Sequence, residues 1–325
     1  MDTTSVIFRS TGDASVLSYE KTQLSSPGEG EVLLSQKVIG VNFIDTYYRS
    51  GLYQTPLPSG LGTEGAGIVE EVGTGVTHLV PGDRVAYAQG PLGSYAEKRT
   101  LPANFVVKIP DNVSFEKAAA VMLKGLTVSY LFHETYQLKK DEVFLFHAAA
   151  GGVGLLACQW ARHIGARMIG TVSSEEKAKV ARDHGAWATI NYSDEDIVKR
   201  VLELNDGKKL SVVYDSVGKS TWTQSLDCLE PRGLMVNFGN ASGAVTGVSL
   251  SELASRGSLY VTRPMLNAYA NTQEKLSQSS ERLFRLVAEN VLDPGISEIL
   301  PLKDARIAHE KLLDRNRIGS LLLLP

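Results

Sequence analysis

The first 115 or so residues alternate apolar and polar positions over short stretches that glycine and proline interrupt. This alternation predicts short β-strands, because successive side chains of a strand point to opposite faces of the sheet. The predicted strands are residues 31–40, 65–73, 83–88, 94–99 and 105–110. Many short strands in succession indicate a barrel-like β-domain.

The pattern changes near residue 115. Residues 115–132 have the composition of a helix, with Ser114 as its predicted N-cap, and this helix leads into a second domain. From about residue 140 apolar strands alternate with amphipathic helices. The predicted strands are 143–147, 167–172, 189–191, 210–216, 234–238 and 258–262, and the helices between them are 153–164, 174–184, 194–204 and 220–229. Such alternation predicts a parallel sheet with crossover helices.

The end of the chain returns to short apolar stretches. A long helix is predicted around residues 274–289, and a last strand at 320–324. We therefore predict a β-domain at residues 1–125 that residues 295–325 complete. Residues 126–270 form the parallel-sheet domain, and residues 271–294 return the chain to the first one.

The composition is that of an ordinary globular protein of two domains, with 325 residues, 43% of them hydrophobic, 21% charged, and a net charge of −3. This balance predicts no nucleic-acid partner. No apolar run approaches the roughly 20 residues that span a bilayer, and residues 1–10 lack a secretion signal, so we expect a cytoplasmic protein without a membrane partner. Cys158 and Cys228 lie in apolar or amphipathic stretches and are predicted to be reduced packing residues.

The strand predicted at 143–147 is followed by a turn of small residues and then by an apolar helix. Small side chains at Ala148, Gly151 and Gly154 let the backbone turn tightly and approach a pyrophosphate, while the helix N-terminus supplies N–H groups. Gly152 and Val153 complete the pattern A-x-x-G-x-x-G. The alternative, a flexible glycine loop, does not account for the strand and helix, which occur in the order that a dinucleotide-binding unit requires.

The end of the next predicted strand indicates which dinucleotide binds. Glu175 and Glu176 compete for the role of the acidic residue that binds the ribose of NAD, but a capping box from Ser173 to Glu176 explains them structurally. The hydroxyls of Ser173 and Ser174, with Lys177 one helical turn on, favour the 2′-phosphate of NADPH.

Other residues follow the later strands, at the sheet edge where ligands bind in open α/β sheets. Tyr192 follows one strand, Ser216 lies in the segment 215–218 after the next, and Phe238, Gly239 and Asn240 follow the one beyond. We expect them to contact the cofactor. A plain turn is the alternative explanation of residues 215–218.

Several motifs resemble those of one enzyme superfamily, in the same order along the chain. Residues 40–45, 62–67, 81–85 and 148–154 resemble the medium-chain dehydrogenases/reductases. Residues 47–53, 215–218, 237–244 and 261–264 resemble more narrowly the zinc-free quinone oxidoreductase branch, akin to zeta-crystallin. The likeness extends over essentially the whole chain.

This resemblance implies a fold of class α/β. A GroES-like β-barrel catalytic domain is built from both chain ends, a Rossmann domain with a doubly wound parallel sheet lies between, and the active cleft lies where they meet. It also implies a homodimer that uses NADPH.

Within this family picture, Asn42 is expected to contact the nicotinamide ribose or the acceptor oxygen. Tyr47 and Tyr53 are expected to be flat walls or weak hydroxyl donors, with loop packing as the alternative. Thr127 would contact the nicotinamide amide. Arg263 and Arg317 would contact phosphate, with simple exposure as the alternative.

Zinc ligands of the related alcohol dehydrogenases are missing. Asn42 stands where those enzymes have Cys, Thr63 and Glu64 stand where they have a His-Glu pair, and two cysteines cannot build their four-cysteine structural site. We therefore predict no metal. No residue is an obvious general acid; Asp45 and Glu64 are weak candidates, since buried carboxylates in a barrel are as often structural acceptors.

A quinone is already a strong electron acceptor and needs no Lewis acid, so a metal-free site can reduce quinones or polarised enones. The resemblance implies the first of these, an NADPH-dependent quinone reductase. Two alternatives remain open. An NADPH-dependent enone or alkenal reductase would share every motif. An NADPH-binding protein with little turnover, of the crystallin or RNA-binding kind, is disfavoured by the intact candidate site and the lack of basic clusters.

Overall fold

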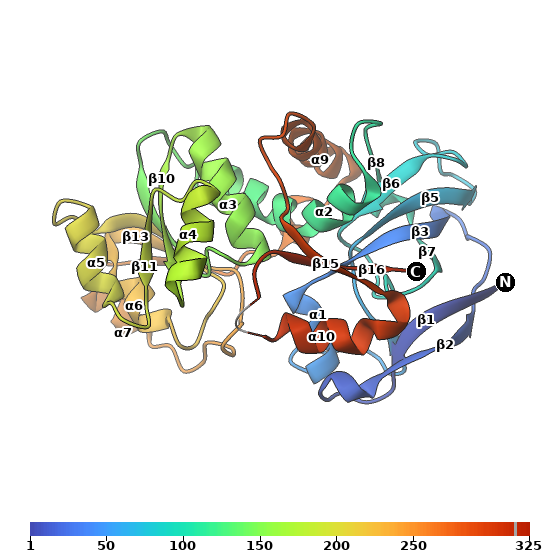
Figure 1. Ribbon diagram of the computed structural model, residues 1–325, viewed down its shortest axis with the longest axis horizontal. Coiled ribbons are helices and arrows are strands. Elements are labelled where there is room, and N and C mark those ends of the chain that lie inside the picture. The colour runs from blue at the N-terminus through green and yellow to red at the C-terminus, as the bar shows by residue number, and fades with distance from the viewer. Residues whose placement is uncertain (315–316) are drawn as a thin grey trace. The chain divides into compact units, whose positions relative to one another are not determined.

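The computed structural model describes residues 1–314 and 317–325, which form two compact units (Figure 1). The first unit comprises residues 1–126 and 270–325, and the second comprises residues 127–269. In the described part of the chain, no helix is both long and apolar enough to cross a bilayer.

The first unit contains a seven-stranded sheet in the order β15-β16-β3-β5-β6-β8, with β7 also paired to β3. Its strands are β3 (Glu31–Val41), β5 (Gly65–Val72), β6 (Arg84–Tyr87), β7 (Lys98–Pro102), β8 (Val107–Lys108), β15 (Ile296–Pro301) and β16 (Ser320–Leu324). A smaller sheet has the order β2-β1-β4, with β1 (Asp2–Phe8), β2 (Leu17–Gln23) and β4 (Ser59–Gly60). β16, near the end of the chain, pairs antiparallel with β3.

Two of the strands predicted in the β-domain differ most from the structure. The strand predicted at 94–99 begins only at Lys98, because the N–H groups of Ser94 and Tyr95 bond to the carbonyls of Gly62 and Leu61 instead of joining the ladder with β3. The strand predicted at 105–110 is reduced to β8, because Phe105 ends a short 3₁₀ turn.

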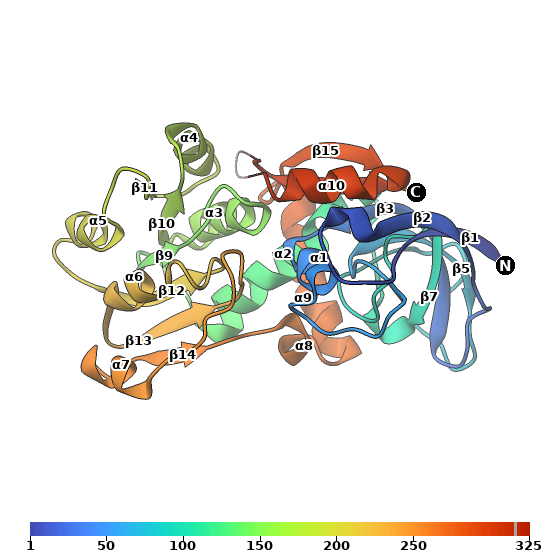
Figure 2. The ribbon, with the colours of Figure 1, turned by 90° about the horizontal axis from the view of Figure 1, so that it is seen from below.

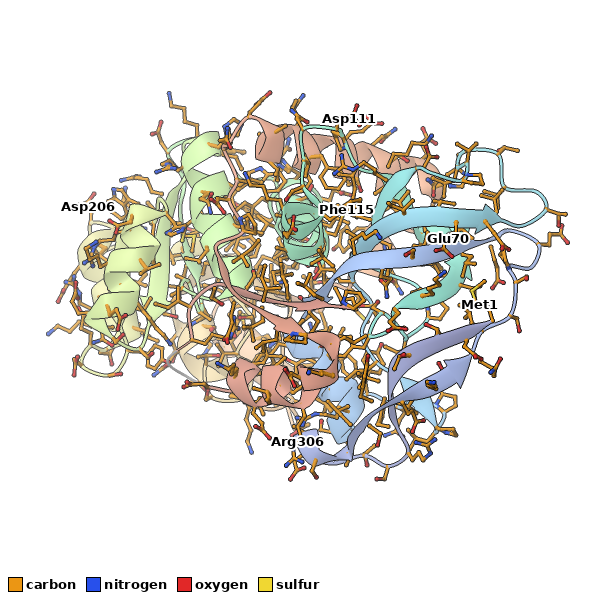
Figure 3. All side chains as sticks on the ribbon, turned by 45° about the vertical axis from the view of Figure 1, so that its right-hand side comes forward. Met1, Glu70, Asp111, Phe115, Asp206 and Arg306 are labelled. Carbon is orange, nitrogen blue, oxygen red and sulfur yellow. The ribbon has the colours of Figure 1, made fainter. Side chains whose placement is uncertain are left out.

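Four helices accompany these sheets: α1 (Phe43–Ser50), α2 (Phe115–Tyr130), α9 (Gln273–Ala288) and α10 (Ala305–Leu312). The predicted N-cap of α2 is confirmed, since Ser114 Oγ accepts a hydrogen bond from Lys117 N at 3.2 Å. The ring of Phe115, labelled in Figure 3, lies under the guanidinium of Arg84, 4.7 Å from its carbon to the ring centroid. The helix passes into a wider π-turn at Leu131–Thr135.

The second unit contains a six-stranded, all-parallel sheet in the order β11-β10-β9-β12-β13-β14. The strands are β9 (Val143–Phe146), β10 (Arg167–Val172), β11 (Ala188–Asn191), β12 (Leu210–Asp215), β13 (Leu229–Asn237) and β14 (Tyr260–Thr262). The helices between them are α3 (Gly152–Ile164), α4 (Glu175–Asp183), α5 (Ile197–Leu204), α6 (Trp222–Asp227) and α7 (Leu250–Ser255), and α8 (Leu266–Tyr269) follows β14. The alternation of strand and helix is as predicted, except that β13 begins five residues before its predicted start and that α7 was not predicted.

The strand order reverses beside β9, from which the chain runs outward to β10 and β11 and then returns to β12. Figure 2 shows α3 and α4 on one face of the sheet and α5 and α6 on the other. The sheet is therefore doubly wound, and the carboxyl ends of β9, β10, β12 and β13 meet at one edge, where such sheets bind ligands.

Candidate functional site

The turn after β9 is held by backbone hydrogen bonds. Gly151 N donates to Ala148 O at 3.0 Å, and Ala149 N donates to Thr171 O at 3.0 Å. Gly151 is the N-cap of α3, and no side chain of the described residues caps this helix. The N–H groups of its first turn therefore form a ready site for an anion.

Glycine is required at one position of this turn. A Cβ atom at Gly154 would lie 2.3 Å from Ala148 O and 2.5 Å from Ala149 O, closer than any real contact, whereas at Gly151 it would lie 3.3 Å from Ala148 O. The backbone of α3 is thus packed against the turn. The flexible-loop alternative is contradicted, and the predicted strand, tight turn and helix are confirmed.

The end of β10 brings a hydroxyl and an amine together. Lys177 Nζ donates to Ser173 Oγ at 3.3 Å. The predicted capping box at Ser173 is wrong: Ser174 is the N-cap of α4, because its extended backbone lets Oγ accept from Lys177 N at 3.3 Å. Glu175 forms an ion pair with Arg182 farther along α4, which gives its carboxylate a structural partner.

Tyr192 lies beside this pair. Tyr192 N donates to Val172 O at 3.1 Å, and Ser193 Oγ donates to Ser173 O at 3.1 Å, so the segment after β11 is tied to the segment after β10. The Tyr192 side chain is 53% exposed. An aromatic ring, a hydroxyl and an ammonium group therefore share one accessible edge of the sheet.

The segments after β12 and β13 are also bound to each other. Ala241 N donates to Ser216 O at 3.1 Å, and a Cβ atom at Gly239 would lie 2.3 Å from that oxygen. Asp215 closes its own turn by accepting from Val217 N at 2.7 Å and Gly218 N at 2.9 Å. The plain-turn alternative therefore accounts for the Asp215 side chain. Phe238 packs its ring 5.4 Å from that of Phe146.

Arg263 is an exposed residue whose guanidinium donates to the end of β13. Its Nη1 donates to Asn237 O at 3.2 Å, and its Nη2 donates to the Asn240 amide at 3.2 Å in the amide orientation that satisfies both groups. Arg263 is therefore exposed, as the alternative holds, and its guanidinium is also hydrogen-bonded to the segment after β13.

Thr127 lies mostly buried on α2 and hydrogen-bonds the hydroxyl of Tyr130, one helical turn on. Burial raises the pKa of Tyr130, and its ring stacks on that of Tyr269 with centroids 4.5 Å apart. Sequence reasoning missed Tyr130, although its spacing of three residues from Thr127 places both on one helix face.

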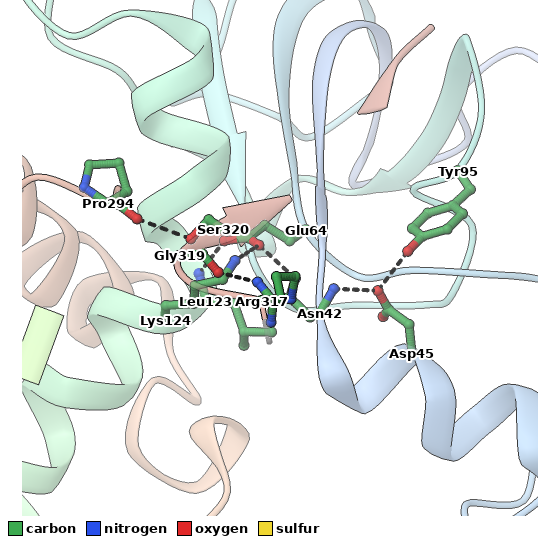
Figure 4. Close-up of polar contacts among 10 residues, drawn as sticks. All are labelled: Asn42, Asp45, Glu64, Tyr95, Leu123, Lys124, Pro294, Arg317, Gly319 and Ser320. Atoms are coloured by element: carbon green, nitrogen blue, oxygen red, sulfur yellow. Dashed lines mark hydrogen bonds and ion pairs between the residues drawn. The ribbon is translucent and has the colours of Figure 1, made fainter. Parts of the chain in front are cut away.

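In the first unit, Asn42 is held by two buried carboxylates (Figure 4). Asn42 Nδ2 donates to Glu64 Oε2 at 2.6 Å, and Asn42 N donates to Asp45 Oδ2 at 2.9 Å. Glu64 is fully buried and also accepts from Leu123 N at 2.6 Å and Lys124 Nζ at 3.3 Å. Glu64 is thus a structural acceptor that fixes the Asn42 amide, and Lys124 is a partner that sequence reasoning missed.

The two predicted tyrosines contact each other. The rings of Tyr47 and Tyr53 meet edge to face with centroids 5.3 Å apart, and Tyr53 N donates to Tyr47 O at 3.0 Å. Tyr48 and Phe43 extend this aromatic cluster at α1. Tyr47 is buried and Tyr53 half-buried. Loop packing therefore explains part of their placement.

Arg317, also in the first unit, is largely turned inward. Its Nη1 donates to Gly319 O, and burial lowers its pKa. The nearby Ser320 Oγ donates to Pro294 O at 3.1 Å, which ties the start of β16 to the segment that precedes β15 (Figure 4). Simple exposure is therefore wrong for Arg317.

A buried chain of titratable groups lies behind Asn42. Tyr95 Oη donates to Asp45 Oδ2 at 2.9 Å and lies 3.1 Å from His309 Nε2. Burial raises the pKa of Asp45 to about 7 and lowers the pKa of His309 to about 3. Burial also raises the pKa of Tyr95 well above its ordinary value.

These shifts predict opposite pH dependences of stability. Between about pH 4 and 7 folded Asp45 keeps a proton that the unfolded chain has lost, so its contribution to the free energy of unfolding falls as pH rises. Between about pH 3 and 6.5 His309 is unprotonated in the folded protein but protonated in the unfolded chain. Its contribution to the free energy of unfolding therefore rises with pH. The two effects oppose each other from about pH 4 to 6.5.

Single variants should separate the two effects in urea unfolding measured at pH 4.5, 5.5 and 6.5. Relative to the wild-type protein, Asp45→Asn should become more stable with rising pH and His309→Gln less stable, each by up to about 1.4 kcal/mol per pH unit. Slopes of the same sign in both variants would contradict this assignment.

Comparison with known proteins places both units in described families. Residues 28–111 match the alcohol dehydrogenase GroES-like domain, and residues 152–282 match the family described as zinc-binding dehydrogenase. A quinone oxidoreductase of Pseudomonas aeruginosa is 57% identical over 319 residues, which are 98% of each chain. A 2-haloacrylate reductase of a Burkholderia species is 44% identical over 94% of each chain.

The crystal structure of Escherichia coli quinone oxidoreductase, solved in complex with NADPH, superposes with a TM-score of 0.98 at 54% identity. It covers 99% of this chain and 100% of its own. The likeness therefore extends over both units.

Proposed function

We propose that this chain, which belongs to the quinone oxidoreductase family of the medium-chain dehydrogenase/reductase superfamily, oxidises NADPH and reduces a quinone. The observation that carries the proposal is the tight turn of Gly154 with the Ser173–Lys177 pair at the next strand end. A fixed array of backbone N–H groups suits a pyrophosphate, and a hydroxyl beside an ammonium suits a 2′-phosphate.

The residues of the second unit fit NADPH. The backbone of the turn would hold the pyrophosphate, the three segments after β10, β11 and β12 would hold the adenosine and ribose groups, and the segment after β13 would hold the nicotinamide ribose. These residues are Ala148, Gly151, Gly152, Val153 and Gly154, then Ser173, Ser174, Lys177, Tyr192 and Ser216, and then Phe238, Gly239 and Asn240. Thr127 would meet the carboxamide, and Arg263 and Arg317 would add positive charge. NADPH supplies the hydride, from C4 of its nicotinamide.

We assign acceptor binding to the first unit. The Asn42 side-chain amide is held in one orientation by Glu64, while Asp45 accepts from the Asn42 backbone N–H. A held amide suits a dipole that polarises a carbonyl without reorganising. Tyr47 and Tyr53 offer an apolar, aromatic contact of the kind a flat quinone ring requires. These three residues are the proposed catalytic set.

We further propose that the reaction needs no zinc. Among the residues that the structure describes, no three His, Cys, Asp or Glu side chains gather closely enough to hold a metal ion. Glu64 is already occupied by Asn42, Leu123 and Lys124. The donor set therefore does not fit zinc, although the matched family is described as zinc-binding.

The proposal includes a cytoplasmic homodimer. The edge strand β14 exposes Tyr260 at 61% and Val261 at 39%, and an open strand of this kind suits pairing with a second copy. Cys158 and Cys228 are unpaired and buried, which suits a reducing compartment.

Competition between acceptors tests this function against its two alternatives. With saturating NADPH, we expect kcat/KM for 1,4-benzoquinone to exceed that for 2-hexenal by at least about tenfold, because a quinone needs no stronger polarisation than a held amide. A preference for 2-hexenal would move the chain to the enone reductases. Tight NADPH binding without turnover of either acceptor would instead support the binding-protein alternative.

A further inference from the structure

A buried histidine at the end of β9 belongs to a chain of hydrogen bonds that the proposed chemistry does not use. His147 is 1% exposed; its Nδ1 lies 3.0 Å from Thr171 Oγ1, and its Nε2 lies 3.0 Å from Ser225 Oγ. Ser225 Oγ donates to Asp215 Oδ2 at 2.7 Å. We call these four residues, from three strand ends and α6, the relay.

The direction of each hydrogen bond in the relay follows from its neighbours. Ser225 gives its hydrogen to Asp215, so its oxygen accepts from His147 Nε2–H. A neutral imidazole carries one N–H, so Nδ1 accepts from the hydroxyl of Thr171. Burial lowers the pKa of His147, which favours this neutral form.

The relay ends at the first residue of the glycine turn. Ala148 N donates to Thr171 Oγ1 at 3.3 Å, and Ala149 N donates to Thr171 O at 3.0 Å. Ala148 has a φ of +58°, in the left-handed region that disfavours residues other than glycine. Such a conformation persists only where the surroundings impose it.

A Ser-His-Asp arrangement usually suggests a hydrolase, but this one cannot attack a substrate. Its carboxylate bonds to the serine and not to the histidine, and Asp215 and Ser225 have no exposed surface. A nucleophile needs access and a histidine that takes its proton. The role of the relay is therefore structural: it orients other groups of the protein and does not react with a substrate.

We propose that Thr171, His147, Ser225 and Asp215 are positioning residues that hold Ala148 in its left-handed conformation and thereby raise the affinity for NADPH. The inference rests on the proposed function in one respect, that NADPH binds at this turn. The relay orients the N–H groups of the turn before the cofactor arrives, so its loss should weaken cofactor binding and leave the acceptor site unchanged.

Thr171→Val tests the relay, because it removes the hydroxyl and keeps the shape of the side chain. We expect it to raise Kd for NADPH about tenfold, with kcat and KM for 1,4-benzoquinone within about twofold of wild type at saturating NADPH. Thr171→Ser keeps the hydroxyl and should bind NADPH within about twofold of wild type. Ser211→Ala, which removes a half-buried hydroxyl that donates to Glu230 near the start of β12, is the matched control and should leave Kd for NADPH unchanged.

A second substitution distinguishes positioning from general loosening. Glycine adopts the left-handed conformation without strain, so Ala148→Gly added to Thr171→Val should recover most of the lost affinity. If Thr171→Val does not fold, Ser225→Ala interrupts the same chain farther from the turn, with an expected rise in Kd of about fivefold.

The outcomes separate the relay from the proposed function. Wild-type affinity in a folded Thr171→Val, or no recovery in the double variant, would overturn the relay while NADPH remains the cofactor. Absence of NADPH binding by the wild-type protein would overturn the proposed function itself.

Discussion

Alanine at position 154 should lower NADPH affinity by at least about 100-fold. The added Cβ would lie 2.3 Å from Ala148 O, so the turn and the first residues of α3 would have to separate. That movement redirects the N–H groups proposed to bind the pyrophosphate. The measurement is the Kd for NADPH from quenching of protein fluorescence, together with the thermal unfolding midpoint.

Two glycine variants provide graded controls for Gly154→Ala. At Gly151, in the same turn, a Cβ would lie 3.3 Å from Ala148 O. Gly151→Ala should therefore raise Kd for NADPH by no more than about tenfold. At Gly28, in the first unit, a Cβ would meet only the flexible carboxylate of Glu31 at 3.3 Å, so Gly28→Ala should bind NADPH normally. Binding by a folded Gly154→Ala within threefold of wild type would exclude this turn as the pyrophosphate site.

Replacing Lys177 by methionine should raise KM for NADPH about 30-fold and leave KM for NADH within about twofold of wild type. Methionine keeps the length of the side chain but removes the ammonium that lies beside Ser173 Oγ. A hydrogen bond to a charged group contributes about 1.5–3 kcal/mol, which corresponds to about 10- to 150-fold in affinity. In the proposed binding mode, the 2′-phosphate of NADPH makes that contact and NADH has no such group.

Lys179→Met is the matched control for Lys177→Met. Lys179 lies on the same helix, and its ammonium pairs with Asp183 at 2.8 Å on the exposed surface. It should change neither KM. Equal rises in KM for NADPH and NADH in Lys177→Met would mean that Lys177 stabilises the helix and does not bind the 2′-phosphate.

Most of the second unit could be predicted from sequence, because each strand, turn and helix carries its own local signal. The strand Arg167–Val172 and the helix from Gly152 to Ile164 lie within one residue of their predicted bounds. In contrast, α1 was missed although its apolar residues follow helical spacing, because it is only eight residues long and lies within a stretch whose pattern predicts strands. Its signals were Asn42, whose N–H is bonded by Asp45, and Gly51, which ends the helix at a φ of +83°.

The candidate site was predictable only where residues adjacent in sequence act together. The glycine turn and the pair of Ser173 with Lys177 are local and were found. Lys124 was missed because its partner, Glu64, is 60 residues away, and Tyr95 and His309 are 214 residues apart. Nothing in a single sequence shows that such distant side chains share a buried site, since the pairing depends on how the sheets bring them together.

The most direct test of the account is steady-state oxidation of NADPH and of NADH by the EDTA-treated protein, with 1,4-benzoquinone as acceptor. The account predicts that kcat/KM for NADPH exceeds that for NADH by at least about tenfold, and that chelation changes neither value. A preference for NADH would contradict the assignment of Ser173 and Lys177 to a 2′-phosphate. Loss of activity on chelation, restored by zinc, would contradict the metal-free site.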